Sequence, residues 1–228
     1  MAIFLDTGVV KEAERFMKMG VIRGVTTNPT ILFKAGVTSG KKGIKVRTIE
    51  ISKIIAPYPL SVEVTTNEYG KMIDQAQEYA GWAKNINVKI TIHGPNGETE
   101  NLEAIHELSS KYKISINATA MMSAQQCLLA AMAGAEYVSL FGGRVNNMGY
   151  NSCSEISKLR CVLDRQKLSS KIIIGSTREV LNVLEWLEAG ADIVTVMPEI
   201  LNGMIVHPYS KETVQMFLRD AAKTEGLL

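Results

Sequence analysis

The sequence has few residues of the kinds that build cross-links or metal sites. Its 228 residues include only three cysteines and three histidines. Cys127, Cys153 and Cys161 form no C-x-x-C pair, and their odd number gives no disulfide framework. No local signature pairs a cysteine nucleophile with a histidine base, and no H-E-x-x-H pattern occurs. The sequence therefore predicts no metal site, and we expect Cys127, which lies in an apolar run, to be a buried free thiol.

Long apolar runs and a strong charge excess are also missing. No run approaches the roughly 20 residues that a membrane span needs. Lysine and arginine number 25 against 23 acidic residues, and a net charge of +2 does not favour nucleic acid as a partner. The first residues, MAIFLDTGVV, have no basic flank and reach Asp6 too early for a signal peptide. We therefore expect a cytoplasmic protein with no membrane or nucleic-acid partner.

Short apolar runs alternate with longer amphipathic ones along the chain. With 46% hydrophobic residues the chain has enough apolar surface to fold. The apolar runs predict strands at 3–6, 24–26, 60–64, 88–91, 114–117, 137–141, 172–175 and 193–197. The amphipathic runs predict helices at 9–19, 45–56, 69–84, 100–112, 123–133, 152–167, 178–189, 199–206 and 211–224. The segment 34–44, rich in glycine and lysine, is expected to be a loop.

A local repeat indicates how these elements are arranged. Ala133-Gly134-Ala135 resembles Ala189-Gly190-Ala191, and each reads as a helix end, a glycine cap and a strand start. The two glycines are 56 residues apart, which fits two strand–helix units, and eight such units fill the chain. The sequence therefore predicts the α/β class: a single (β/α)8 TIM-type barrel domain over 1–228, with an additional C-terminal helix at about 211–224. An open doubly wound sheet remains the alternative, although no G-x-G-x-x-G follows the first strand.

Charged residues stand at or near the ends of three predicted strands, where such barrels hold their active sites. Lys89 interrupts the apolar strand Asn87–Thr91. If it points into the barrel, burial favours its neutral amine, which can attack a carbonyl and form a Schiff base. Asp6 and Glu63 would then move protons. The alternatives are a lysine that points outward past a helix, or carboxylates that only form an ion pair with it.

Two later loops predict a site for an anionic group. They read Gly142-Gly143-Arg144 and Ser176-Thr177-Arg178, and they follow the sixth and seventh predicted strands. Glycine lets the backbone approach a ligand, hydroxyls donate, and arginine binds two oxygens at once. Each loop can also be read as a plain turn or helix start. Thr27-Asn28-Pro29-Thr30 is typical of a turn into a helix, with Pro29 as an early helical position.

These residues, taken in order, resemble the motifs of a known family. The resemblance is to the small transaldolases, which include the related fructose-6-phosphate aldolases, and it runs from residue 3 to about 209. It implies a parallel barrel and a class I aldol mechanism that uses neither metal nor cofactor. The motifs are Leu5-Asp6-Thr7, the run GVTTNPT at 24–30, VEV at 62–64, VKI at 88–90, NAT at 117–119, Gly143-Arg144 and Ser176.

The resemblance also implies roles for these residues. Lys89 forms the Schiff base with a ketose donor, and Asp6 exchanges a proton with the substrate hydroxyl during carbon–carbon cleavage. Glu63 and Thr119 hold a water that relays protons. The implied substrate-binding residues are Thr26, Asn28, Asn117, Phe141, Arg144, Ser176 and Arg178.

Two positions favour a transferase over an aldolase within the family. The resemblance implies that the aldolases of the family have a glutamine at the position of Glu63 and a catalytic tyrosine at the position of Phe141. A phenylalanine cannot protonate the enamine, so the three-carbon unit should survive until an aldehyde accepts it. The implied reaction transfers dihydroxyacetone from a ketose with an anionic C6 group to an aldose such as glyceraldehyde 3-phosphate or erythrose 4-phosphate. The alternatives are an aldolase that releases free dihydroxyacetone and a non-catalytic barrel that binds phosphosugars.

The chain departs from the family pattern in and after the loop Gly142-Gly143-Arg144. Gly142 replaces a branched residue, and Asn146 and Asn147 replace two acids. Neutral amides beside the anion suit a sulfonate, which carries one negative charge. The donor is therefore expected to be either fructose 6-phosphate or the sugar sulfonate 6-deoxy-6-sulfofructose.

The predicted helix at 211–224 bears on assembly. It carries Val214, Met216, Phe217 and Leu218, which can pack on a neighbouring subunit or on the chain's own barrel. Small members of the family form rings and decamers, so the resemblance implies a homo-oligomer, up to a decamer.

Overall fold

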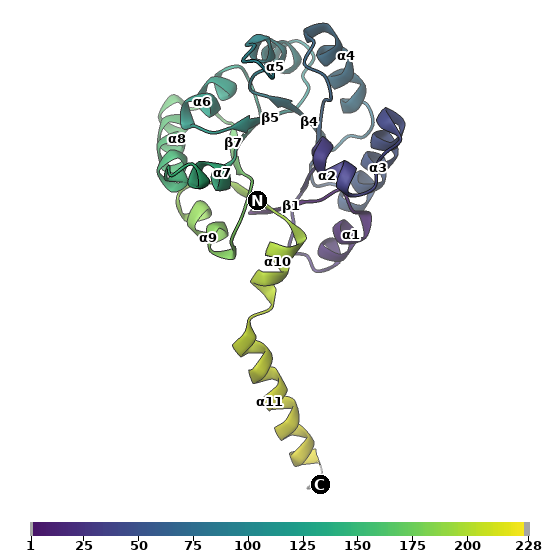
Figure 1. Ribbon diagram of the computed structural model, residues 1–228, viewed down its shortest axis with the longest axis vertical. Coiled ribbons are helices and arrows are strands. Elements are labelled where there is room, and N and C mark those ends of the chain that lie inside the picture. Colours follow the sequence, from purple (N-terminus) through teal and green to yellow (C-terminus); the bar gives the residue numbers. More distant parts are fainter. Residues whose placement is uncertain (1, 226–228) are drawn as a thin grey trace.

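Eight parallel strands close into a barrel within residues 2–225, the part of the chain that the computed structural model describes. Each strand pairs with its neighbours in sequence, and the last pairs with the first through Phe4 and Thr195. The helices form a ring outside the strands (Figure 1). The strands are β1 Ile3–Asp6, β2 Val25–Thr26, β3 Leu60–Glu63, β4 Ile86–Thr91, β5 Ile116–Met121, β6 Tyr137–Leu140, β7 Lys171–Ile174 and β8 Ile193–Val196.

The helices from α1 to α9 connect successive strands and cover the outside of the barrel, and α10 and α11 follow the last strand. They are α1 Val10–Lys18, α2 Pro29–Lys34, α3 Gly40–Ile55, α4 Tyr69–Ala80, α5 Glu100–Ser110, α6 Ala124–Met132, α7 Gly142–Asn147, α8 Ser152–Gln166, α9 Val180–Glu188, α10 Pro198–Ile205 and α11 Pro208–Glu225. No described helix is both long enough and apolar enough to span a bilayer.

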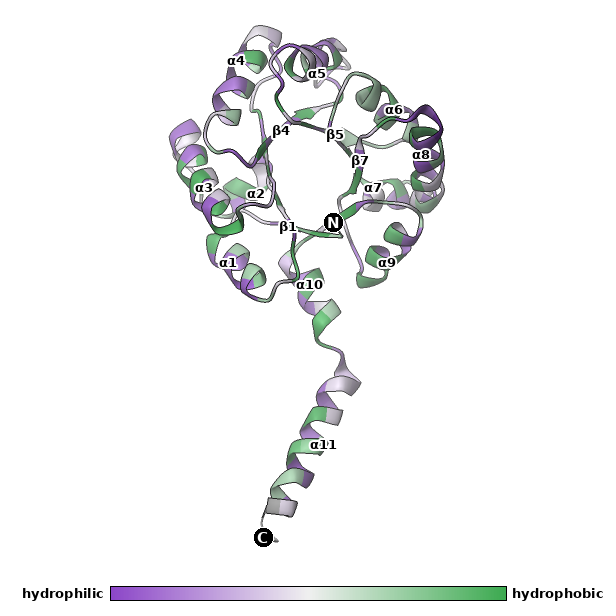
Figure 2. Ribbon diagram, turned by 180° about the vertical axis from the view of Figure 1, so that it is seen from behind, coloured by the Kyte–Doolittle hydropathy of each residue, from purple (hydrophilic) through white to green (hydrophobic). Residues whose placement is uncertain are grey.

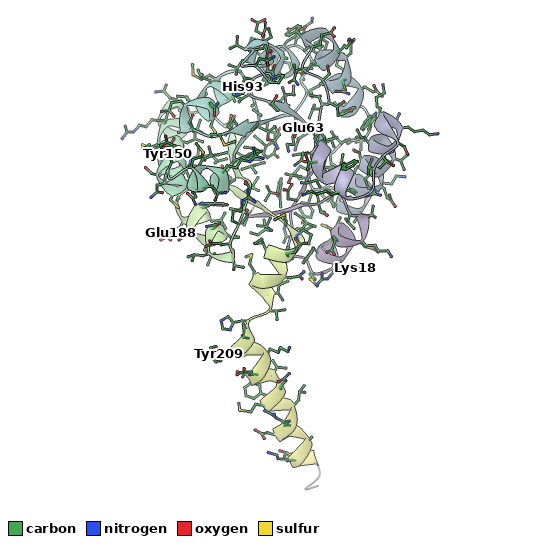
Figure 3. All side chains as sticks on the ribbon, in the orientation of Figure 1. Lys18, Glu63, His93, Tyr150, Glu188 and Tyr209 are labelled. Carbon is green, nitrogen blue, oxygen red and sulfur yellow. The ribbon has the colours of Figure 1, made fainter. Side chains whose placement is uncertain are left out.

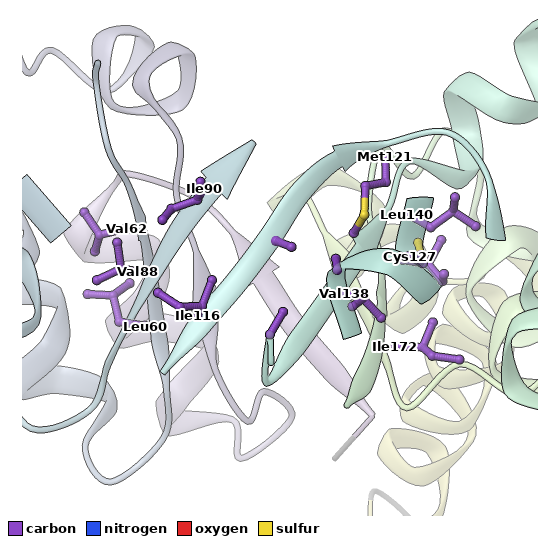
Figure 4. Close-up of a cluster of buried hydrophobic side chains, with 14 of the residues drawn as sticks. Leu60, Val62, Val88, Ile90, Ile116, Met121, Cys127, Val138, Leu140 and Ile172 are labelled. Carbon is purple, nitrogen blue, oxygen red and sulfur yellow. The ribbon is translucent and has the colours of Figure 1, made fainter. Parts of the chain in front are cut away.

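The two-residue period of the strands separates the core from the site. In β4, Val88 and Ile90 are fully buried in the layer between strands and helices. Figure 4 shows them with Leu60 and Val62 of β3 in this layer. Lys89 lies between Val88 and Ile90, so its side chain points to the opposite face, which is the barrel interior. The strand period therefore decides which residues build the core and which face the interior.

A second, smaller cluster fills the lower part of the barrel. It consists of Phe4, Tyr137, Ile173 and Ile193. Each lies two positions before a residue that lines the upper interior, so these side chains close the barrel beneath the site. Gly24 leaves room for this layer, because a Cβ at Gly24 would lie 2.6 Å from the Phe4 ring.

The barrel predicted from the sequence is confirmed, and the open-sheet alternative is wrong. Each of the eight predicted strands overlaps an observed one, although β5 extends to Met121, beyond the predicted end at 117. The loop predicted at 34–44 is wrong from residue 40, because α3 begins at Gly40. The short helix α7 was not predicted, since its opening glycine pair reads as a turn.

The additional C-terminal helix is present and extends away from the barrel. Figure 1 shows α11 as a projecting rod. Every residue from 203 to 224 is exposed, so the alternative in which this helix docks on its own barrel is wrong. Figure 2 shows hydrophobic and hydrophilic segments alternating along it. Its apolar side chains include Val214, Phe217 and Leu218, which are 55%, 62% and 66% exposed.

Candidate active site

A cavity of about 540 Å³ opens at the carboxyl ends of the strands. Residues from all eight strands or their ends line it, and most of them are polar. A second hollow of about 570 Å³ lies on the surface of α1 and is lined by residues of that helix and its cap alone. The barrel cavity is the candidate active site, because it brings together titratable groups from distant parts of the chain.

Lys89 points into this cavity and is held by two oxygen atoms. Its Nζ donates to the carbonyl oxygen of Thr27 at 2.9 Å and lies 3.1 Å from Glu63 Oε2. The register of β3 and β4 pairs Glu63 with Lys89, which explains their contact. Figure 3 shows Glu63 on the inner side of the ring of helices, next to the place of β4 in Figure 1. The outward orientation considered for Lys89 is wrong, whereas the ion pair with Glu63 is present and leaves Lys89 facing the cavity.

Asp6 is the second carboxylate of the cavity. Its Oδ1 accepts a hydrogen bond of 2.6 Å from the Thr26 hydroxyl. Burial raises the pKa of the Asp6 carboxyl above its ordinary value, while Lys89 and the Thr26 hydrogen bond act in the opposite direction. A carboxyl with a raised pKa holds a proton more readily near neutrality, which suits a group that exchanges protons with a substrate.

Thr119 offers the cavity an unused hydroxyl. Thr119 is 1% exposed, and its Oγ1 has no hydrogen-bond partner within the described residues. The next residue, Ala120, has a φ of +62° at a register shift in the pairing of β5 with β6. This irregularity lies directly beside the cavity, where strained backbone is often part of a functional site. A buried hydroxyl facing a cavity can hold a water molecule or a substrate oxygen.

The two predicted anion loops lie against each other at the cavity rim. A Cβ at Gly143 would lie 1.8 Å from the carbonyl oxygen of Ser176, so only glycine allows this approach. Ser176 has a φ of +62°. Arg144 and Arg178 both line the cavity, and the Phe141 ring lies 5.2 Å from the Arg144 guanidinium carbon. The close contact therefore gathers two cations and a hydroxyl at one place.

The departures from the family pattern have a structural explanation at Gly142. A Cβ there would lie 2.7 Å from Ile174 and 2.8 Å from the Trp186 ring, so the buried indole occupies the space of a side chain. Asn146 Oδ1 accepts a hydrogen bond of 3.0 Å from the backbone amide of Ser152, the first residue of α8. Neither Asn146 nor Asn147 belongs to the described lining of the cavity, so the expected amides beside the anion are not found there.

Two predicted binding residues occupy different places. Asn28 lines the cavity, and its Oδ1 also accepts from the Ile31 amide at 2.9 Å, which caps α2. Asn117 is fully buried outside the described lining, where it donates to Ser61 Oγ and accepts from Ser139 Oγ. Asn117 therefore holds the barrel interior together beneath the cavity instead of facing it.

Several lining residues were missed by the reasoning from sequence. Ser139 and Thr195 lie inside β6 and β8, before the strand ends that were searched for polar residues. The strand period would have placed them inward, because each is two residues beyond an inward-facing side chain. Lys34 at the end of α2 adds a third cation to the rim. Within residues 2–225 no three histidine, cysteine or acidic side chains gather as a possible metal site.

Comparisons with known proteins agree with this arrangement. Residues 3–227 match the profile of the family described as transaldolase/fructose-6-phosphate aldolase. A "Probable transaldolase" of Carboxydothermus hydrogenoformans is 36% identical over 220 residues, covering 96% of this chain and 97% of that protein. Another of Thermoplasma acidophilum is 37% identical over 223 residues, covering 98% and 96%. The solved thiamine phosphate pyrophosphorylase of Pyrococcus furiosus shares the fold alone, with a TM-score of 0.61 at 12% identity over 86% of this chain and 85% of that one.

Proposed function

The chain belongs to the transaldolase/fructose-6-phosphate aldolase family and has that family's enzyme activity, and we propose that it transfers a dihydroxyacetone unit between sugars through a Schiff base on Lys89. The observation that carries this proposal is the inward-facing Lys89 amine, which is 5% exposed, contacts Glu63 and lines the same cavity as the unused Thr119 hydroxyl. These groups lie where such barrels carry out their chemistry.

The proposed reaction begins at the donor carbonyl. Lys89 Nζ attacks C2 of the ketose, water leaves, and an iminium forms. Asp6 accepts the proton of the C4 hydroxyl as the C3–C4 bond breaks, and the bonding electrons move into the iminium to give an enamine. The aldehyde formed from C4 onward departs, the enamine attacks an acceptor aldehyde, and Asp6 returns a proton to the new hydroxyl. Water then hydrolyses the resulting iminium, which releases the product ketose and frees the Lys89 amine. Glu63 and Thr119 are proposed to hold the water that enters and leaves with the iminium.

A sugar phosphate is the donor that the cavity rim favours. Arg144, Arg178 and Lys34 line the rim together with Ser176. Several cations and a hydroxyl suit the two negative charges and three oxygens of a terminal phosphate. The case for 6-deoxy-6-sulfofructose rested on Asn146 and Asn147, which lie outside the described lining. We therefore propose fructose 6-phosphate as the donor and an aldose phosphate such as erythrose 4-phosphate as the acceptor; glyceraldehyde 3-phosphate, the fragment released from this donor, is the acceptor in the reverse reaction.

Phe141 supports transfer over release of dihydroxyacetone. Its ring lines the cavity beside Arg144 and has no hydroxyl that could deliver a proton to the enamine. Without that proton the three-carbon unit stays on Lys89 until an aldehyde arrives. The aldolase that releases free dihydroxyacetone is the second candidate.

We also propose that α11 joins copies of this chain into a homo-oligomer. Its apolar side chains, including Val214, Phe217 and Leu218, are exposed and have no cover within the described chain. An exposed apolar helix face of this kind is typical of an interaction site. A second copy supplies the same helix and the same barrel surface, so one contact can repeat around a ring.

Intact-mass measurement after borohydride reduction tests the chemistry. The enzyme is incubated separately with fructose 6-phosphate and 6-deoxy-6-sulfofructose. We expect a three-carbon adduct on Lys89, which should form at a lower concentration of fructose 6-phosphate than of 6-deoxy-6-sulfofructose. The Lys89→Met variant should bind phosphate donor but form no adduct. No adduct on the wild-type protein with either donor would contradict the proposal and favour a binding barrel. Trapping at much lower concentration with the sulfosugar would reverse the choice of donor.

A further inference from the structure

Strand β8 brings a third hydroxyl against the pair formed by Thr26 and Asp6. Thr195 Oγ1 lies 2.6 Å from Thr26 Oγ1, which in turn lies 2.6 Å from Asp6 Oδ1. Thr195 is 6% exposed and Thr26 is 3% exposed. β1 lies between β2 and β8 in the barrel, so the three side chains form a short chain across three adjacent strands.

The number of protons shared by these three side chains fixes which atom donates in each hydrogen bond. Each threonine hydroxyl has one proton to donate, and an ionised carboxylate can only accept. With Asp6 ionised, Thr26 must donate to Asp6, because no other proton lies between them. The Thr26 oxygen then accepts, and the donor at 2.6 Å is Thr195. Thr195 therefore keeps the Thr26 hydroxyl oriented as a donor to the Asp6 carboxylate.

The same chain runs the other way when Asp6 gains a proton on Oδ1. Asp6 then donates to Thr26, and Thr26 donates to Thr195. The proton of Thr195 becomes free to point into the cavity, which Thr195 lines. Each direction fits one protonation state of Asp6, so both states keep their hydrogen bonds.

We propose that Thr195 is a positioning residue that acts on Asp6 through Thr26 and sets how tightly Asp6 holds a proton during turnover. This proposal rests on the proposed role of Asp6 as the group that exchanges a proton with the substrate. Thr195 contacts Thr26 in the structure, and its effect on the reacting atoms passes through that hydroxyl.

Other charged groups that face Asp6 stay in place when the Thr195 hydroxyl is removed. Glu63 of β3 and Lys89 of β4 act on Asp6 through their charges. The strands on either side of Asp6, β2 and β8, contribute the hydroxyls of Thr26 and Thr195. The cations Arg144, Arg178 and Lys34 lie at the cavity rim. Loss of the Thr195 donor weakens Thr26 as a donor to the carboxylate. Asp6 should therefore keep its proton to a higher pH, and the acidic limb of the pH–rate profile should move upward.

The backbone of Thr195 is held independently of its hydroxyl. Its carbonyl oxygen accepts from Thr177 Oγ1 at 2.9 Å, in the loop that carries Ser176 and Arg178. Its methyl group lies 3.5 Å from the position of a Cβ at Gly175. Valine keeps the backbone carbonyl and the methyl groups, so Thr195→Val removes the hydroxyl with little change of shape.

The test compares Thr195→Val with Thr195→Ser in the full-length enzyme, by the pH dependence of kcat/KM for dihydroxyacetone transfer. We expect the acidic limb of Thr195→Val to move upward by about 0.5 to 1 pH unit, since one hydrogen bond is worth about 1 kcal/mol. We expect Thr195→Ser to restore the wild-type limb. Thr48→Val is the matched control, because Thr48 is a buried threonine of α3 whose hydroxyl has no partner among the described residues.

The outcomes separate this proposal from the proposed function. An unmoved limb in Thr195→Val, or a serine variant that behaves like valine, would overturn the role of Thr195. If Thr195→Val does not fold, Thr195→Ala gives the same comparison. Borohydride trapping is measured alongside. An adduct on Lys89 with an unmoved limb refutes only the role of Thr195, whereas no adduct on the wild-type protein refutes the Schiff base itself.

Discussion

Glu63 and Lys89 are register partners on adjacent strands, and their side chains form an ion pair of 3.1 Å that is almost sealed from solvent. The Lys89 side chain is 6% exposed and that of Glu63 is 16% exposed. A sealed ion pair makes the site sensitive to loss of one partner, because the remaining charge is left without a counter-charge. The two residues that are proposed to act in catalysis are therefore also expected to affect stability.

Removing one member of this pair should cost more stability than removing both. We expect Lys89→Met to lower the free energy of unfolding by about 2 to 4 kcal/mol, and the double variant with Glu63→Gln to recover about half of that loss. Urea unfolding of the wild type, Lys89→Met, Glu63→Gln and the double variant measures these free energies. A double variant as unstable as the sum of the two single variants would show that the pair is not coupled.

Asp6 should limit the stability of the protein at neutral pH. Burial raises the pKa of its carboxyl, so the folded protein keeps this proton at pH values where the unfolded chain has lost it. The stability that the protonated Asp6 carboxyl contributes is present at low pH and is lost as the pH rises through the pKa of Asp6 in the folded protein. Asp6→Asn should therefore melt at a higher temperature at pH 7, with the advantage shrinking toward pH 4, and should lose about 100-fold or more of its activity. A wild-type protein more stable than the variant at pH 7 would contradict the sign.

The contact between Gly143 and Ser176 should govern affinity for the anionic end of the substrate. An alanine Cβ would lie 1.8 Å from the Ser176 carbonyl oxygen, so the two loops must separate. We expect Gly143→Ala to raise KM for a phosphorylated donor by about tenfold or more, because one charge-assisted contact is worth roughly 1.5 to 3 kcal/mol. Gly70→Ala in α4 is the control, since nothing lies within 4 Å of its added methyl group. Equal KM values for the two variants would refute this.

Phe141 should decide whether the three-carbon unit is transferred or released. Phe141→Tyr keeps a ring beside Arg144 and adds a phenol that can protonate the enamine. We expect a higher ratio of free dihydroxyacetone to transferred product, measured in the presence of acceptor. Phe141→Leu removes the ring without adding a phenol and should not raise that ratio. A wild-type enzyme that releases dihydroxyacetone as fast as it transfers it would show that the site already acts as an aldolase.

Removal of α11 should separate assembly from folding. All residues from 203 to 224 are exposed, so cutting the chain after Val206 uncovers no core. We expect a smaller mass by light scattering and unchanged melting of the barrel in a dilute sample. Phe217→Asp with Leu218→Asp should act like the truncation, whereas Thr224→Asp, on the same helix, should not. An unchanged mass in the truncated protein would exclude α11 as the interface.

The alternation of apolar and amphipathic runs was enough to predict the barrel. Strands such as β4 are apolar wherever they face the helices, and the glycine caps before β6 and β8 mark equal strand–helix units. Lys89 stood out because it interrupts such a strand, and the charge of Asp6 and Glu63 at strand ends pointed to the same rim. Local patterns of this kind depend only on burial and period, and the sequence carries both.

The tertiary structure decided which residues meet. The strand period turns Ser139 and Thr195 inward and Lys34 ends a short helix, but only the closed barrel shows that all three line the cavity. Asn117 matches a motif, yet the strand register places it below the cavity, bonded to Ser61 and Ser139. Gly142 is explained by Ile174 and Trp186, which lie far along the chain and fill the space of its side chain.

The sequence by itself predicted the eight-unit barrel and marked Lys89 and the loops at 142–144 and 176–178 as candidates, because each follows from local composition and the period of a strand. It did not determine the chain of hydroxyls from Asp6 through Thr26 to Thr195, or the exposed position of α11. The hydroxyl chain depends on closure of the barrel, which brings β8 next to β1, and the exposure of α11 depends on the direction in which the chain leaves the barrel after α10. Contacts between the two ends of a chain arise only when the fold closes.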